Sequence, residues 1–188
     1  MKRIRKSFIV SMCLLTAFVL WTVAICFVDV RAIGPQGSSV GFAGINGFVH
    51  TLTGVHFSLY NITDWLGLVP IFVCIGFGIL GLVQWIKRKS IRKVDHNILI
   101  LGGFYIVTIA TYLFFESVVI NYRPVLINGY LEASYPSSTT MLVMCVMPTA
   151  IMQLGSRIKS KALRNIVAVS IITFITFMVI GRLFSGVH

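Results

Sequence analysis

The sequence is poor in charged residues and poorest in acidic ones. Of its 188 residues, 11% are charged and 57% are apolar, and only 5 are Asp or Glu. Soluble domains contain about 25% charged residues. The composition therefore excludes an ordinary soluble protein and predicts a single membrane domain that comprises residues 1–188.

Paired cysteines are also lacking. The four cysteines, Cys13, Cys26, Cys74 and Cys145, lie inside apolar segments and have no paired spacing. A disulfide framework or a cysteine metal site needs such spacing. The cysteines are therefore predicted to be small packing residues.

The formal net charge of +11 comes mainly from three short basic clusters. They consist of Lys2, Arg3, Arg5 and Lys6; Lys87, Arg88, Lys89, Arg92 and Lys93; and Arg157, Lys159, Lys161 and Arg164. Basic residues along one face would indicate nucleic-acid binding, but these lie in alternate loops, which is typical of cytoplasmic loops. We therefore predict a multi-pass cell-membrane protein with a cytoplasmic N-terminus, contacts with anionic membrane lipids and no nucleic-acid partner. The oligomeric state is left open.

Five apolar segments are predicted to cross the bilayer, which takes about 20 residues per helix. They cover residues 8–28, 65–85, 98–120, 139–154 and 166–183. The predicted fold is all-α, a polytopic transmembrane helical bundle. In the second segment, Gly76, Gly78 and Gly81 predict close contact with another helix.

The polar-leaning segment 31–64 is predicted to be an extracytoplasmic loop. It contains a short interfacial helix, because apolar side chains recur there at helical spacing. These are Ile45, Phe48, Leu52, Val55 and Leu59. His50 and His56 are expected to be interfacial polar residues or to contact lipid headgroups.

Three arginines lie outside the basic clusters: Arg31, Arg123 and Arg182. Arg31 is expected either to pair with Asp29 or to anchor at headgroups. Arg182 falls at the outer end of an apolar segment, where an arginine is costly and is a candidate functional residue. Arg123 precedes a proline, which disfavours helix at the preceding residue, so the third helix should end there.

A helix start is predicted at Pro136, which is followed by Ser137, Ser138 and Thr139. The hydroxyls are expected to cap this helix, whose first N–H groups have no helical partner. Helix N-termini bind phosphate, and one arginine can donate two hydrogen bonds to two phosphate oxygens. Together with Arg123, Arg182 and His188, this start is predicted to form an anion site. The alternative is that the serines only cap and the arginines only reach for headgroups.

These pieces resemble the three motifs of the type 2 phosphatidic acid phosphatase (PAP2) family of membrane lipid phosphatases. The family pattern is Lys-x6-Arg-Pro, then Pro-Ser-Gly-His, then Ser-Arg-x5-His with an aspartate four residues later. This chain has Arg123-Pro124, then Pro136-Ser137-Ser138-Thr139, then Gly181-Arg182 with His188 after five further residues. The resemblance covers a motif-bearing core at about residues 98–188.

The resemblance implies a lipid phosphatase that uses neither metal nor cofactor and forms a phosphohistidine intermediate. His188 would be the nucleophile, while Arg123, Arg182, Ser137 and Ser138 would hold the phosphoryl oxygens. The implied substrate is a lipid phosphomonoester or pyrophosphate on the extracytoplasmic face. Undecaprenyl pyrophosphate, phosphatidic acid and phosphatidylglycerophosphate represent the type.

The chain departs from the family pattern at several positions. Glu116 stands at the motif lysine, seven residues before Arg123 and thus on nearly the same face of a helix. Thr139 stands at the general-acid histidine, and its hydroxyl does not release a proton near neutral pH. Gly181 replaces the motif serine.

The sixth span and the orienting aspartate of the family would lie beyond residue 188, so five of an expected six spans are present and we expect a C-terminally truncated chain. The changes at Glu116 and Thr139 favour lipid pyrophosphates as substrates, because these need less acid assistance.

Two alternatives stay open. One is a catalytically impaired relative that binds lipid phosphates without turnover, and the other is a small transporter or other helical membrane protein with no phosphate site.

Overall fold

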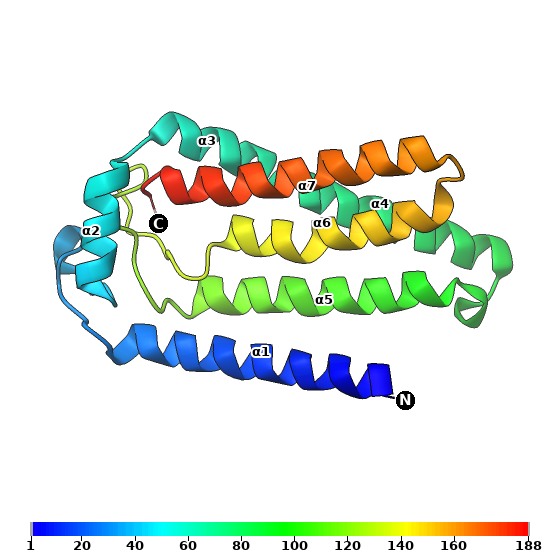
Figure 1. Cartoon of the computed structure of the whole chain (residues 1–188), viewed down its shortest axis with the longest axis horizontal. Coiled ribbons are helices and arrows are strands. Elements are labelled where there is room, and N and C mark those ends of the chain that lie inside the picture. Colours follow the sequence, from blue (N-terminus) through cyan, green and yellow to red (C-terminus); the bar gives the residue numbers. More distant parts are fainter. Residues whose placement is uncertain (1, 188) are drawn as a thin grey trace. The chain divides into compact units, whose positions relative to one another are not determined.

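The computed structural model describes residues 2–187, and its regular structure is helical (Figure 1). The elements are α1 (Lys2–Phe27), η1 (Pro35–Gly37), α2 (Ala43–Thr53), α3 (Phe57–Leu66), α4 (Leu68–Arg88), η2 (Ile91–Lys93), α5 (His96–Ser117), α6 (Ser138–Arg157) and α7 (Lys161–Phe184). The chain divides into two compact units. The N-terminal unit consists of Met1–Thr53 and Val119–Tyr135, and the bundle unit consists of Gly54–Val118 and Pro136–His188.

Five helical segments are long and apolar enough to cross a membrane. They are Ile4–Phe27, Phe57–Arg88, His96–Ser117, Ser138–Arg157 and Lys161–Phe184. The prediction of an all-α protein with five apolar spans is thereby confirmed. These features indicate a multi-pass membrane protein.

Helix α6 is the centre of the bundle unit, where it contacts α4, α5 and α7 (Figure 1). Its buried residues Val143, Val146, Met147 and Ala150 recur at intervals of three to four, as expected for one face of a helix. Val143 and Met147 pack with Ile171 and Met178 of α7. This packing places the N-terminus of α6 near the C-terminus of α7, because the two helices run antiparallel.

The second span begins earlier than predicted. The apolar residues of 45–59 do not form one helix: α2 ends at Thr53, Gly54 has a φ of +65°, and α3 begins at Phe57. A glycine in the left-handed region is a common helix stop. Val55 therefore lies in the linker, and Leu59 belongs to the membrane-length segment that continues into α4.

Two predictions about small residues are wrong in part. A Cβ added at Gly76 or Gly78 would meet no atom within 4 Å, whereas one at Gly81 would lie 3.0 Å from Cγ2 of Ile98. Only Gly81 therefore serves a close helix contact. The cysteines are free thiols, and Cys13 and Cys26 are exposed on α1, so these two do not act as the predicted packing residues.

The N-terminal unit is held together by hydrogen bonds around the end of α1. Arg31 pairs with Asp29 at 2.7 Å, which confirms the first alternative for this arginine. Asp29 also accepts a hydrogen bond from the Gly44 N–H, and this bond together with Arg31 holds the pKa of Asp29 below its ordinary value. The Gly41 N–H donates to the Asn121 side chain, which ties segment 119–135 to this unit.

Two of the basic clusters meet at one end of the bundle unit. Asp95, His96 and Asn97, at the start of α5, line a small polar pocket with Ser156 and Arg157 at the end of α6. The α4–α5 and α6–α7 connections therefore lie on the same side, as expected for alternate loops.

Candidate functional site

Arg182 is buried in the last turn of α7, and its side chain is only 2% exposed. Its guanidinium donates hydrogen bonds to the Tyr60 carbonyl at 3.5 Å and to Thr63 Oγ1 at 3.4 Å. It also pairs with Asp64 at 3.5 Å and lies over the Tyr60 ring, 4.7 Å from the centroid. A cation in the last turn of a helix is further stabilised by the helix dipole. Helix α3 therefore supplies every contact described here for this charge.

The contacts of Arg182 are long for a charged group. Charge-assisted hydrogen bonds are typically about 2.7–2.9 Å. Asp64, the anion at this site, is 54% exposed and so remains accessible from solvent. The geometry is that of a buried cation facing a solvent-accessible anion.

The N-terminus of α6 reaches the same place as Arg182. A Cβ added at Gly67, between α3 and α4, would lie 2.9 Å from Thr139 Cγ2 and 2.8 Å from the Asp64 carbonyl. The junction of α3 and α4 therefore contacts Thr139 on one side and Arg182 on the other. The structure thus brings two of the predicted site residues together through Thr63, Asp64 and Gly67.

Gly181 is required by the packing of α7 against α3. A Cβ at this position would lie 2.8 Å from Thr63 Cγ2, and Thr63 is fully buried. A serine at this position, as in the PAP2 motif, would displace Thr63, which accepts a hydrogen bond from Arg182. The glycine is thus part of how this chain holds its arginine.

The end of α7 is anchored beyond Arg182 as well. The His56 N–H donates to the Ser185 carbonyl at 2.9 Å. The backbone of Gly186, with a φ of +66°, packs directly against Gly54, because a Cβ there would lie 1.6 Å from the Gly54 carbonyl oxygen. The chain that leads to residue 188 is therefore fixed against the α2–α3 linker.

The predicted helix start at residues 136–139 is confirmed, but the predicted caps are not. Helix α6 begins at Ser138, with Ser137 as N-cap in an extended conformation and without a side-chain capping bond. The Ser137 hydroxyl oxygen is buried and has no hydrogen-bond partner among the described residues. An unpaired buried hydroxyl is unfavourable, so this group is available to a ligand.

Arg123 lies in the N-terminal unit, in a short hairpin and not at a helix end. Helix α5 ends at Ser117, and bridges pair Tyr122 with Ala133 and Ile127 with Tyr130. The side chain of Arg123 is 8% exposed, donates to the Ala133 carbonyl at 3.0 Å and pairs with Glu132 at 3.3 Å. The prediction that the third helix continues to this arginine is wrong, because the hairpin takes over the backbone hydrogen bonds.

The three remaining predicted site residues have different outcomes. Glu116 is exposed near the end of α5, and since Arg123 lies beyond that helix, the two do not share a helix face as predicted. His188, the predicted nucleophile, lies outside the described residues. Ser138 is the first residue of α6 and lies within the predicted helix start.

Sequence reasoning missed the acidic partners of both buried arginines, Asp64 and Glu132. Their signal was the scarcity of acidic residues: among five in the chain, four pair with an arginine. The hairpin had a signal too, because Asn128-Gly129 is the dipeptide favoured in two-residue hairpin turns, and both residues have positive φ angles. The choice of Asp64 as partner for Arg182 had no local signal.

Comparisons of the chain with protein-family models, with curated protein sequences and with solved structures gave no significant match.

Proposed function

We propose that this protein is an integral-membrane lipid phosphatase of the type 2 phosphatidic acid phosphatase kind, with its site on the extracytoplasmic face of the membrane. Its substrate is a lipid pyrophosphate or phosphomonoester. Arg182 binds the phosphoryl oxygens, assisted by the first N–H groups of α6 and the hydroxyls of Ser137 and Ser138. His188 is the nucleophile.

The proposed reaction has two steps. An imidazole nitrogen of His188 attacks phosphorus, and the bond from phosphorus to the leaving oxygen breaks. Water then cleaves the phosphorus–nitrogen bond and releases inorganic phosphate. The buried Arg182 and helix N–H groups stabilise the charge on the phosphoryl oxygens in both transition states.

The observation that carries the proposal is the meeting of Arg182 and the α6 N-terminus at one helix junction. Thr139 and Arg182 contact the same turn between α3 and α4. An arginine buried to this extent in a membrane-length helix is costly, which makes it a candidate functional residue. A helix start with a buried, unpartnered Ser137 hydroxyl beside it supplies the further donors that a phosphate needs.

The surroundings of Thr139 favour a pyrophosphate substrate. Thr139 is buried and its methyl group packs on Gly67, so no titratable group stands at the family's general-acid position. The leaving group of a lipid pyrophosphate is a phosphate monoester, which is a weak base and needs no proton. The leaving group of a phosphomonoester is a strongly basic alkoxide, which needs a proton from a general acid.

One observation favours a second candidate function, lipid-phosphate binding without turnover. Asp64 already occupies Arg182, so a phosphate has to displace a carboxylate before it binds. A site with this competitor and without a general acid retains anion recognition more readily than catalysis. We expect Asp64→Asn to increase affinity for inorganic phosphate in either case, because it removes the competing charge.

The test is phosphate release by the purified full-length protein in nanodiscs, with undecaprenyl pyrophosphate and phosphatidic acid as separate substrates. We expect faster release from the pyrophosphate, none with His188→Ala, and a loss of about 100-fold with Arg182→Lys. Arg164→Lys, on the exposed start of the same helix, is the matched control and should retain full activity.

Two outcomes would change the assignment. Absence of release by a folded protein, combined with lipid-phosphate binding that depends on Arg182, would establish the binding function. Equal turnover of both substrates would contradict the argument from the leaving group.

A further inference from the structure

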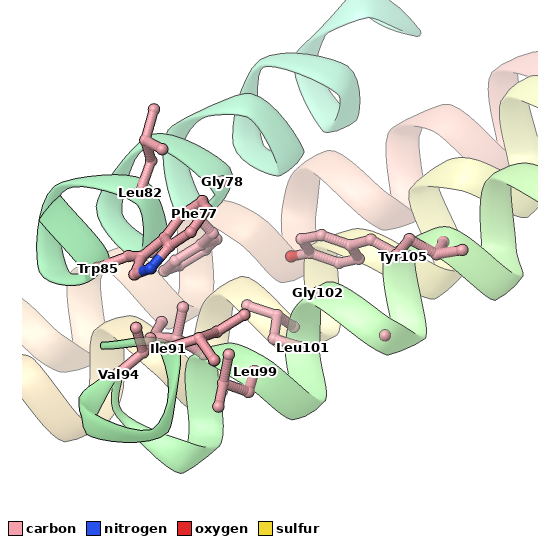
Figure 2. A pocket seen from close by; sticks show the side chains of 14 residues that line it. Phe77, Gly78, Leu82, Trp85, Ile91, Val94, Leu99, Leu101, Gly102 and Tyr105 are labelled. Carbon is pink, nitrogen blue, oxygen red and sulfur yellow. The ribbon is translucent and has the colours of Figure 1, made fainter. Parts of the chain in front are cut away.

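A lateral apolar pocket lies between α4 and α5 at the end of the bundle unit that carries the basic loops. Figure 2 shows Phe77 and Trp85 of α4 opposite Ile91 and Leu101, with Tyr105 further along α5. Its volume is about 390 Å³, within the range of about 300–1,000 Å³ typical of small-molecule sites. Its lining is almost entirely hydrocarbon, so an apolar chain is the ligand that fits it.

Missing side chains keep this pocket open. A Cβ added at Gly78 of α4, or at Gly102 or Gly103 of α5, would meet nothing within 4 Å. All three glycines line the pocket. Unlike Gly67 and Gly181, they permit no close packing and instead leave space between two helices.

Basic side chains flank the pocket along the chain. Five of them lie in the sequence between the lining residues Trp85 and Val94: Lys87, Arg88, Lys89, Arg92 and Lys93. Each basic residue is within three positions of a lining residue, so its backbone lies within about 11 Å of that residue. Arg88 pairs with Asp95. The other four are exposed and form no ion pair within residues 4–187.

We propose that this pocket binds an anionic phospholipid of the adjoining leaflet, with an acyl chain between α4 and α5 and the phosphate among Lys87, Lys89, Arg92 and Lys93. Basic residues beside a membrane helix attract anionic lipids, and tryptophans such as Trp85 favour the interface at which the phosphate lies. The charge selects an anionic lipid over a zwitterionic one.

This site is separate from the proposed phosphatase site. Gly67, three residues after Asp64, is the N-cap of α4, and Trp85 lies eighteen residues after it, which corresponds to roughly 27 Å along the helix. The lipid bound here is therefore a structural or regulatory ligand and not the substrate held by Arg182. Its binding can be tested without any assay of phosphate release.

The experiment uses Trp85 as the reporter. The chain has three tryptophans, so Trp21→Phe with Trp65→Phe leaves Trp85 alone. This protein is placed in nanodiscs of phosphatidylcholine that contain either brominated phosphatidylglycerol or brominated phosphatidylcholine at the same mole fraction. We expect the brominated anionic lipid to quench Trp85 fluorescence several-fold more effectively. Equal quenching by the two lipids would mean that bulk lipid fills the pocket and would overturn the proposal.

Charge and shape are then tested apart. Replacing Lys87, Lys89, Arg92 and Lys93 by glutamine should abolish the preference for the anionic lipid, whereas replacing Arg157, Lys159, Lys161 and Arg164 should leave it unchanged. An equal loss in both variants would overturn the assignment of the headgroup to this loop.

Gly102→Leu should fill the pocket and reduce quenching by both lipids. Gly76→Leu is the matched control, since its site is equally open but outside the pocket. If Gly102→Leu is folded and is quenched like the control, no acyl chain occupies the pocket. Should a variant not fold, the two-lipid comparison on the reporter protein still decides the proposal.

Discussion

Each end of the bundle unit has an arginine–carboxylate pair. The pair with the shorter distance is the more exposed one, and we expect it to contribute less to stability. At the α4–α5 loop, Arg88 and Asp95 are 2.9 Å apart, and both side chains are nearly half exposed. At the α3–α7 end, Arg182 and Asp64 are 3.5 Å apart, but the arginine is 2% exposed. Burial of the cation, and not the distance, decides which pair contributes more to the free energy of unfolding. Water screens the Arg88–Asp95 pair, whereas Asp64 compensates the charge of an arginine that is removed from water.

The glycines of the two ends differ in the same way. Gly67 and Gly181 are sites at which a Cβ would collide with a neighbour, so they bring helices together around Arg182. Gly78 and Gly102 face empty space and keep a pocket open. One end of the unit is thus tightly packed and polar inside, and the other is loosely packed, apolar inside and charged at its surface.

The largest expected effect is that of Asp64→Asn. This change leaves the buried Arg182 without its described anion, and we expect a loss of about 2–3 kcal/mol in the free energy of unfolding. The value lies below that of a fully buried pair because Asp64 is half exposed. Chemical unfolding in detergent micelles, followed by tryptophan fluorescence, measures it. Asp95→Asn is the control, and a loss of equal size there would refute the comparison.

Gly181→Ser comes next, although it would bring the chain closer to the motif that it resembles. The added side chain meets Thr63, and overpacking of this kind costs about 1–3 kcal/mol. The same unfolding measurement applies, with Gly76→Ser as control because a side chain at residue 76 meets open space. A stable Gly181→Ser protein would show that α7 and α3 are less tightly packed than described.

Gly102→Ala should have a smaller effect, of opposite sign. An alanine methyl fits the open space, and alanine favours helix over glycine by about 0.8–1 kcal/mol. We expect a modest rise in the melting temperature. Gly67→Ala at the packed end should lower it instead, and a rise at both positions would remove the distinction between the two kinds of glycine.

The smallest expected effect concerns the pH dependence of the Arg88–Asp95 pair. Hydrogen bonds from Arg88 and Gln84 hold the pKa of Asp95 below its ordinary value. A lowered carboxyl pKa contributes stability that is present above the ordinary pKa and is lost as the pH falls through the lowered value. The melting temperature of the wild type should therefore begin to approach that of Asp95→Asn below about pH 4 and should reach it at a pH below the lowered pKa. A difference that stays constant as the pH falls below about pH 4 would contradict this cause.

The helices were predictable because their signals are local. A run of about 20 apolar residues forms a helix in a membrane whatever its neighbours are, since its backbone groups must bond within the segment. Pro136 with Ser137 predicted the start of α6 for an equally local reason. The end of α5 was misplaced because a hairpin competes there for the same backbone groups. Its signal, Asn128-Gly129, is local as well and was overlooked.

The site was only partly predictable. Arg182 stood out because an arginine in an apolar segment is rare. That it faces Asp64 and Tyr60, and that Gly181 is there to admit Thr63, depends on α3 packing against α7. Periodicity within either helix carries no information about that pairing.

The sequence alone thus determined the class of protein and its five apolar spans, and it marked Arg123 and Arg182 as candidate site residues, because hydrophobic length and charge distribution act segment by segment. The tertiary structure decided which carboxylate each arginine meets, which glycines close a contact and which leave a pocket. Those outcomes depend on side chains from helices far apart in the chain, whose meeting is set by packing and not by any property of one segment.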